Sequence, residues 1–486
     1  MADTQIHENA KLNIWEALTP VLILIALLAF NVSVFGDDAL SGSNQFILLI
    51  GGAIAAIVGF RNQVSYRHMM NEVGKNLMSV TQPILILLFV GALAGTWLIS
   101  GIIPSMIYYG LKILSPSIFL PASVVICAII SIATGSSWTT TATVGIALIG
   151  IGQAIGVSPG MAAGAVISGA YFGDKMSPLS DTTNLAPAMA GGELFSHIRY
   201  MALTTVPTIS ITLLIFIILS FTLAPTDNAD TQELLTAISN TFYISPVLFI
   251  VPAVVIFLIV RKTKPLIALL VGTLLGGLFA AIFQSEVVQI AAGAKQFDLS
   301  VAYKGVMNAM TVDVSIPSGN ELLDDEGLFT AGGMAGMLGT IWLIICAMVF
   351  GGIMDAIGAL ARISQALLSL ANSTFSLFAS TVASCLALNV TASDQYLALV
   401  VPGKMFAKAY EDRGLAPENL SRTLEDSGTV TSVLVPWNTC GAYQSGVLGV
   451  GVGEYFFYAI FNYLSPFMTL LFAALNIKIK RLVSDR

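Results

Sequence analysis

Residues 173–184 read Gly-Asp-Lys-Met-Ser-Pro-Leu-Ser-Asp-Thr-Thr-Asn, a polar stretch that apolar sequence encloses on both sides. Before it, residues 151–172 contain one glutamine and no charge, and a long aliphatic segment begins at Met201. Flanks of this kind are typical of membrane-spanning helices. We therefore expect Asp174 and Asp181 to lie at membrane depth, where a carboxylate costs about 2.5–3.5 kcal/mol and is tolerated mainly beside a partner or a cavity. Function is the default interpretation of this stretch.

The composition indicates a polytopic membrane protein. Of the 486 residues, 56% are hydrophobic and only 10% are charged, against about 25% charged in soluble domains. The chain reads as one transmembrane domain over 1–485, without a basic patch for nucleic acid, and its net charge of −7 reflects acidic loops. The first apolar run, 15–34, reads as a spanning helix embedded in the lipid bilayer rather than as a cleaved signal peptide.

Apolar runs long enough for a core of about 30 Å predict an all-α fold with about twelve transmembrane segments. The candidate spans are 15–35, 45–60, 83–100, 117–133, 138–155, 160–172, 201–223, 244–260, 265–283, 334–354, 375–390, 395–409 and 455–475. Shorter or Gly/Pro-broken pieces occur at 102–114, 178–191, 358–371 and 429–450. They suit half-helices or re-entrant hairpins, which are allowed only where they are buried in protein or line water.

Loop charges predict the orientation. The connections 61–75 and 261–264 are basic, whereas 36–44, 224–240 and 313–326 are acidic. By the positive-inside rule, we expect a multi-pass protein of the cell membrane with both termini cytoplasmic and the acidic loops outside.

The second half of the sequence echoes the first. Trp138 with Tyr396 and Pro178 with Pro436 are pairs with the same spacing, 258 residues. The copy within 61–223 follows a basic loop and the copy within 300–475 follows an acidic one, so the two would enter the membrane from opposite sides. Such inverted-topology repeats are typical of secondary transporters, whose sites lie at the repeat interface between broken helices.

Four polar breaks, two in each repeat, are the expected parts of the site. Residues 134–141 are matched by 389–394, and residues 173–184 are matched by 425–439. Each break combines hydroxyls, carboxylates or amides with Gly or Pro, and oxygen ligands of this kind suit a hard cation such as Na⁺. Asp174 and Asp181 are the expected carboxylate ligands of Na⁺. The residues expected to bind ion or substrate are Ser136, Ser137, Asp174, Ser177, Asp181, Asn184, Asp394, Asp426 and Asn438.

Structural roles are open alternatives for several of these residues. Asp174 could form an ion pair with the adjacent Lys175, and Arg422 could neutralise Asp426. Hydroxyls in helices often bond back to the preceding turn. No histidine lies inside the four breaks, so proton chemistry at membrane depth would rest on carboxylates. The cysteines, which have no zinc-site or redox spacing, are Cys127, Cys346, Cys385 and Cys440.

Several motifs resemble the NhaC-type family of Na⁺/H⁺ antiporters. They are Gly-Ser-Ser-Trp-Thr-Thr from Gly135, the stretch 173–184 with the Leu-Ala that follows it, residues 91–104, and the late Leu-Glu-Asp-Ser-Gly-Thr and Pro-Trp-Asn-Thr-Cys-Gly. The resemblance runs from about residue 14 to 475 and departs in loops, including the acidic 313–326. It implies a transporter with inverted repeats and hairpins that reach the membrane middle. The family also includes a malate/lactate exchanger, so the resemblance leaves the substrate open.

The leading hypothesis is exchange of Na⁺ for H⁺, with a role in pH homeostasis, in which one buried carboxylate cluster binds either the ion or protons. The alternative is a Na⁺/H⁺-coupled exchanger of a small organic anion of the malate/lactate type, for which Lys175, Lys404 or Arg422 could bind the carboxylate. A passive channel is disfavoured because the sequence has no repeated carbonyl-loop filter. An enzyme is disfavoured because it has no nucleophile–base or metal set. No cofactor is expected besides the transported Na⁺ and H⁺, and a homodimer is an open alternative.

Overall fold

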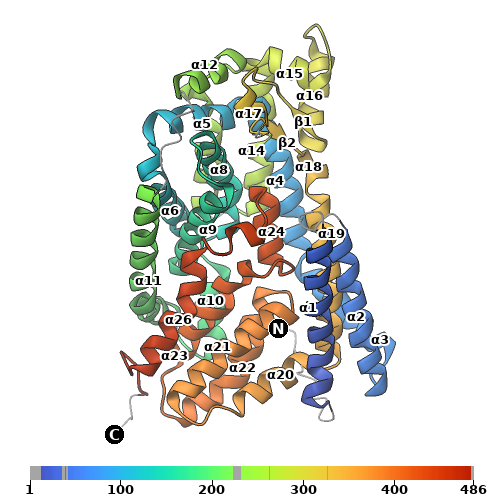
Figure 1. Cartoon of the computed structure of the whole chain (residues 1–486), viewed down its shortest axis with the longest axis vertical. Coiled ribbons are helices and arrows are strands. Elements are labelled where there is room, and N and C mark those ends of the chain that lie inside the picture. The colour runs from blue at the N-terminus through green and yellow to red at the C-terminus, as the bar shows by residue number, and fades with distance from the viewer. Residues whose placement is uncertain are drawn as a thin grey trace.

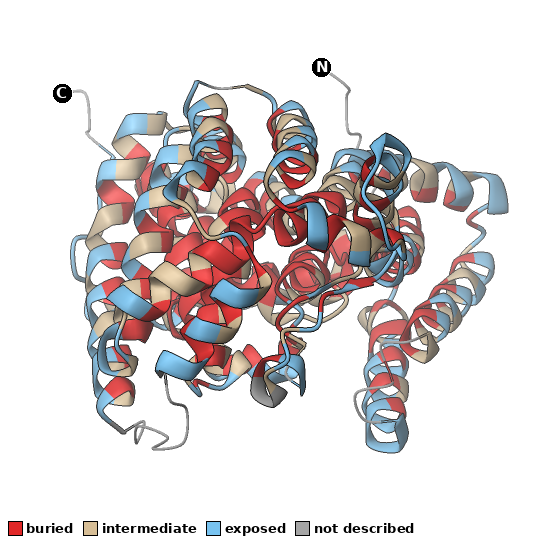
Figure 2. Ribbon diagram, turned by 90° about the horizontal axis from the view of Figure 1, so that it is seen from above, coloured by how far each residue is buried: buried red, intermediate tan, exposed pale blue. Residues whose placement is uncertain are grey.

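A computed structural model describes residues 12–35, 39, 42–222, 231–261, 263–325 and 327–482. Within these ranges the chain is almost entirely helical and elongated (Figure 1). Seen from above, buried residues gather in the middle and exposed residues lie around the rim (Figure 2). Many rim residues are large and apolar, such as Phe30, Phe221 and Ile282, as expected for helices that face lipid.

Eight helices in the described part of the chain are long and apolar enough to cross a membrane, and a pair bent by 79° could make a ninth. The predicted all-helical polytopic fold is therefore confirmed. The long helices are α1 (Ile14–Phe35), α2 (Ser43–Arg61), α4 (Thr81–Ile99), α6 (Pro116–Thr134), α11 (Leu194–Thr222), α14 (Pro265–Phe283), α18 with α19 (Gly333–Gly336 and Leu338–Ala356) and α21 (Thr374–Thr391). The bent pair is α12 (Thr231–Thr241) with η3 (Pro246–Phe249) and α13 (Ile250–Val260).

The other segments counted toward the expected twelve are shorter or interrupted. In the first half, the predicted span 138–155 is a helix that widens into a π-turn, and 160–172 belongs to a helix that carries charge at its end. These elements are α5 (Ile102–Ile113), α7 (Ser137–Thr140), η2 (Thr141–Gly145), α8 (Ile146–Ala154), α9 (Pro159–Met176) and α10 (Asp181–Ala190). Helices α6 and α8 form a hairpin in the upper half of the molecule (Figure 1).

The turn of this hairpin requires glycine. Gly135 ends α6 in the left-handed conformation, with φ of +70°, which other residues rarely adopt. A Cβ atom there would also lie 2.5 Å from the Cβ atom of Leu179. Gly135 therefore lets the hairpin turn rest directly against the interruption between α9 and α10, which Pro178 marks.

The second half has the same parts in the lower half of the molecule. Helices α21 and α22 form a hairpin there (Figure 1), and the helix that begins at Pro417 is interrupted before α24. The elements are α20 (Ala359–Leu368), α22 (Gln395–Asp412), α23 (Pro417–Leu424), η4 (Glu425–Thr429), η5 (Ser432–Leu434), α24 (Thr439–Leu448), α25 (Val452–Tyr455) and α26 (Ile460–Ala474).

Two loop regions of opposite charge lie at opposite ends of the molecule. Helix α3, which follows the basic connection at Arg61, lies at the lower end, and the acidic region around α17 lies at the upper end (Figure 1). The orientation expected from loop charge and the repeat boundaries both stay predictions. The remaining elements are α3 (Tyr66–Ser79), α15 (Ser285–Ala292), α16 (Leu299–Thr311), α17 (Glu321–Asp325) and the antiparallel pair β1 (Val314–Ser315) and β2 (Thr330–Ala331).

Candidate functional site

A cavity of about 560 Å³ lies where the two hairpin turns and the two helix interruptions meet. Its lining includes 134–136 from the first hairpin turn, 179–182 from the first interruption, 394–396 from the second hairpin turn, and Thr439 from the second interruption. The beginning of α4 and the connection between α13 and α14 complete the wall. The structure thus brings together all four polar breaks that the sequence predicts.

Asp174 is held by the turn of the first hairpin. It lies in the last turn of α9, and its Oδ2 atom accepts hydrogen bonds from Ser137 N at 3.0 Å and from Ser137 Oγ at 2.7 Å. The adjacent Ser136 caps α7 by accepting a hydrogen bond from Thr139 N at 3.2 Å. Ser136 and Asp174 line the cavity, whereas Ser137 holds Asp174 from outside the lining.

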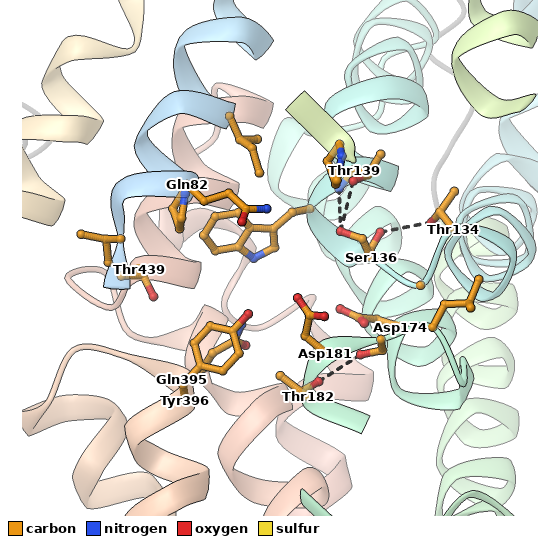
Figure 3. A pocket seen from close by; sticks show the side chains of 18 of the residues that line it. Gln82, Thr134, Ser136, Thr139, Asp174, Asp181, Thr182, Gln395, Tyr396 and Thr439 are labelled. Atoms are coloured by element: carbon orange, nitrogen blue, oxygen red, sulfur yellow. Dashed lines mark hydrogen bonds between the residues drawn. The ribbon is translucent and has the colours of Figure 1, made fainter. Parts of the chain in front are cut away.

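Asp181 is the more accessible carboxylate of the cavity. It begins α10, and Figure 3 shows its side chain beside that of Asp174, both pointing into the cavity. Its side chain is exposed and has no hydrogen bond or ion pair in the described part of the chain. A carboxylate at a helix N-terminus is favoured by the helix dipole, and here it stays free to bind a ligand.

Asp394 supplies a third carboxylate from the second half. It caps α22 by accepting hydrogen bonds from Tyr396 N at 2.8 Å and Leu397 N at 3.0 Å, both through Oδ1. Thr439 N donates to Ser393 O at 2.9 Å, which ties the second hairpin turn to the second helix interruption. Asp394 and Tyr396 both line the cavity.

Three predicted ligands lie outside the cavity lining and bond to the backbone instead. Ser177 Oγ donates to Ile132 O at 2.8 Å, and Asn184 Nδ2 donates to Ser180 O at 2.7 Å. Asn438 caps α24 and donates to Asn389 O at 3.0 Å. These side chains satisfy backbone groups that the helix interruptions would otherwise leave unpaired. They shape the site rather than line it.

Asp426 also lies away from the cavity, in a fully buried ion pair with Lys175. Thr204 Oγ1 donates to its Oδ2 at 2.8 Å, Ser465 Oγ donates to its Oδ1 at 3.3 Å, and Thr469 is a further donor. The partner of Lys175 is therefore Asp426 and not the adjacent Asp174. Consecutive residues of a helix do not face each other, so adjacency in sequence was a poor guide to this pair.

Arg422, the other candidate partner of Asp426, is held by aromatic rings. It is fully buried, and its guanidinium carbon lies 4.6 Å from the ring centre of Tyr200. No ion pair involves it within the described residues. Such cation–π contact stabilises a buried guanidinium.

Two aromatic residues belong to the cavity although the sequence reasoning did not count them as ligands. Trp138 lines it and stacks on Tyr443, with ring centres 3.9 Å apart. Tyr396 lines it with 37% of its surface exposed. The equal spacing of Trp138 and Tyr396 within the two halves was the signal that could have identified them. Gln82 and Gln395, which also line the cavity, had no such signal.

Interrupted helices that meet around an acidic cavity in the middle of an all-helical membrane protein are typical of secondary transporters that carry cations. The comparison with known families agrees with this class. The chain belongs to the Na⁺/H⁺ antiporter family, which matches residues 169–477.

Known relatives extend the similarity over most of the chain. The Na⁺/H⁺ antiporter NhaC of Alkalihalophilus pseudofirmus is 39% identical over 424 residues, 87% of this chain and 88% of the relative. The malate-2H⁺/Na⁺-lactate antiporter of Bacillus subtilis is 35% identical over 462 residues, 94% and 92% of the two chains. An uncharacterized Na⁺/H⁺ antiporter of Haemophilus influenzae is 33% identical over 480 residues, 98% and 99% of the two chains.

Proposed function

We propose that this protein exchanges Na⁺ for H⁺ across the cell membrane, and that Asp174 and Asp181 bind the two ions in turn. The observation that carries the proposal is that both carboxylates point into one cavity at which the interrupted helices meet (Figure 3). The names of the NhaC relative of Alkalihalophilus pseudofirmus and of the Haemophilus influenzae relative support the same cargo. Hydroxyl groups of the hairpin turn, including Ser136, supply further oxygen ligands that suit Na⁺.

The exchange follows from competition at one site. Na⁺ binds to ionised carboxylates, and a proton that binds to either carboxylate removes the charge that attracts Na⁺. The protein then reorients only when its carboxylates are neutralised by one cargo or the other. The hairpins and interrupted helices of residues 61–223 and 300–475 would act as inverted repeats that open the cavity to each side alternately.

The cavity wall suggests which side is open in this structure. Ile259, Thr263 and Pro265 line it beside the basic connection 261–264, and Ser79 and Val80 line it at the end of α3. By the positive-inside rule these connections face the cytoplasm. We infer that the structure represents the state open to the cytoplasm, with both termini on that side.

Exchange of an organic anion is the weaker candidate. Helix N-termini, which favour anions, do meet at the cavity, but those of α10 and α22 already carry the carboxylates of Asp181 and Asp394. No Lys, Arg or His belongs to the described lining of the cavity. Lys175 is paired with Asp426, Arg422 is packed against rings, and Lys404 is not a lining residue. The relative that carries malate and lactate keeps this candidate worth testing.

The test is transport by the purified protein in liposomes that contain a pH-sensitive dye. An imposed Na⁺ gradient is expected to change the internal pH, and Asp181→Asn is expected to abolish the change. Malate or lactate gradients without Na⁺ are expected to have no effect. A pH change that requires malate or lactate would contradict Na⁺/H⁺ exchange and favour the organic-anion candidate.

A further inference from the structure

The cavity is larger than an inorganic ion needs. A Na⁺ ion with a shell of about six waters takes roughly 180 Å³ at ~30 Å³ per water, whereas the cavity measures about 560 Å³. Cavities of about 300–1,000 Å³ are the size at which proteins bind small organic molecules. The cavity volume is therefore large enough for a small organic ion.

The charge of the cavity determines which organic molecules fit. Three carboxylates line it, those of Asp174, Asp181 and Asp394, and its described lining contains no basic side chain. Such a lining repels carboxylates and phosphates and attracts cations. An ammonium group gains charge-assisted hydrogen bonds to carboxylates, which are stronger than neutral ones.

Part of the cavity wall offers no ligand for a bare ion. Val80, Pro83 and Ile86 line the cavity around the start of α4, and Ile259 lines it from the end of α13. These side chains offer no oxygen ligand, whereas an alkyl chain packed against them is removed from water at a gain of about 25 cal/mol per Å². The cavity is thus acidic at the helix interruptions and apolar along α4.

An accessible aromatic ring lies within the same space. Tyr396 has 37% of its surface exposed although it lines a cavity inside the protein. In Figure 3, Tyr396 and Asp181 approach the cavity from different elements, α22 and α10. A cation held by Asp181 then lies near the Tyr396 side chain, and proteins recognise organic ammonium groups through aromatic side chains.

We propose that the cavity also binds a small organic cation, a primary alkylammonium ion, in competition with Na⁺. The ammonium group binds between Asp174 and Asp181 beside the ring of Tyr396, and the alkyl chain packs against the apolar wall at α4. The proposal rests on the proposed function in one respect, namely that the same two carboxylates hold Na⁺.

The probe is n-butylammonium, and n-butyrate, which has the same length and the opposite charge, is its control. Binding is measured with detergent-solubilised full-length protein at one fixed pH, since amines collapse pH gradients across vesicles. The first measurement is displacement of radioactive Na⁺, with K⁺ added at equal ionic strength as the control for screening. The second is the thermal unfolding midpoint with n-butylammonium alone, which does not depend on Na⁺ binding.

We expect n-butylammonium, but not n-butyrate or K⁺ at equal concentration, to displace Na⁺ and to raise the unfolding midpoint. Tyr396→Ala is expected to weaken the apparent affinity for n-butylammonium by about 2- to 5-fold more than that for Na⁺, the ratio that an accessible cation–π contact supplies. Tyr396→Phe keeps the ring and is the matched control. Asp181→Asn is expected to remove the shift in the unfolding midpoint.

Displacement by n-butylammonium that is no greater than that by K⁺, together with an unchanged unfolding midpoint, would overturn the proposal. Equal loss of both affinities in Tyr396→Ala would overturn the role of the ring. The liposome assay keeps the two proposals apart. If Na⁺ drives a pH change but n-butylammonium does not bind, only the proposal of an organic cation is refuted. If n-butylammonium binds but Na⁺ drives no pH change, only the proposal of Na⁺/H⁺ exchange is refuted.

Discussion

The ion pair between Lys175 and Asp426 joins α9 to η4 without exposure of either side chain. In Asp426→Asn, the Lys175 ammonium would stay buried without a carboxylate. Removal of one partner from a buried pair costs about 3–5 kcal/mol, and we expect this variant to lose stability in that range. Lys175→Met should fall at the lower end, because the hydroxyls of Thr204 and Ser465 still donate to the carboxylate.

The double variant with Lys175→Met and Asp426→Asn is expected to regain most of the lost stability. It contains no buried charge, and replacement of both partners of a buried pair is often neutral or stabilising. The matched control is Lys408→Met. Lys408 is 73% exposed in its pairs with Glu411 and Asp412, and exposed pairs contribute only about 0–1 kcal/mol.

Thermal unfolding in detergent measures the stability of all four variants, and Na⁺-driven pH change in liposomes measures their exchange. Because Asp426 does not line the cavity, the double variant should still exchange Na⁺ for H⁺. A double variant as unstable as the worse single variant would refute the pairing argument. A double variant that is stable but does not exchange Na⁺ for H⁺ would show that Lys175 or Asp426 takes part in transport and not only in stability.

Further expectations concern the cavity and the topology. Asp181→Asn should abolish exchange at nearly unchanged unfolding temperature, since no hydrogen bond or ion pair within the described residues depends on the Asp181 side chain; a large drop in that temperature would contradict this. Asp174→Asn should also abolish exchange, and an added Lys175→Met should not restore it because Lys175 pairs with Asp426. The apparent Na⁺ affinity should weaken about tenfold for each pH unit below the pKa of the shared carboxylate, per competing proton, and an affinity that is flat from about pH 6 to 9 would indicate separate sites. Cysteines placed in 61–75 should react with an impermeant label from the cytoplasmic side and those in 313–326 from the outside; labelling from one side would refute the inverted repeats.

The sequence was sufficient to predict the breaks in the helices, because Gly, Pro and clustered hydroxyls interrupt apolar runs in a way that only a cavity or protein interior tolerates. Gly135, Asp174, Asp181 and Asp394 meet at the cavity for this reason. The number of continuous spans was less predictable, since a run such as 138–155 is apolar enough to cross the membrane, but its helix, Ser137–Ala154, is interrupted by a π-turn.

The roles of individual polar residues depended on contacts between distant parts of the chain. Lys175 and Asp426 are 251 residues apart, and neither residue type nor spacing reveals that they pair. Asn438 looks like a ligand in sequence, but it donates to the carbonyl oxygen of Asn389, which lies 49 residues away and which only the folded backbone brings within reach. The apolar part of the cavity wall at α4 was equally hidden, because Pro83 and Ile86 read as ordinary residues of the spanning helix predicted over 83–100.

Because Trp138 lines the cavity and stacks on Tyr443, its fluorescence can report on the state of the cavity. Indole emission responds to the polarity and motion of its surroundings, and Trp138 is the tryptophan, among those described, that lines the cavity. Two of the five tryptophans, Trp15 and Trp342, are largely exposed and could be replaced by phenylalanine at little cost to packing. Trp97 and Trp437 would stay as a background. Changes in the emission of Trp138 would then follow, without any attached dye, what enters and leaves the space between the two halves of the protein.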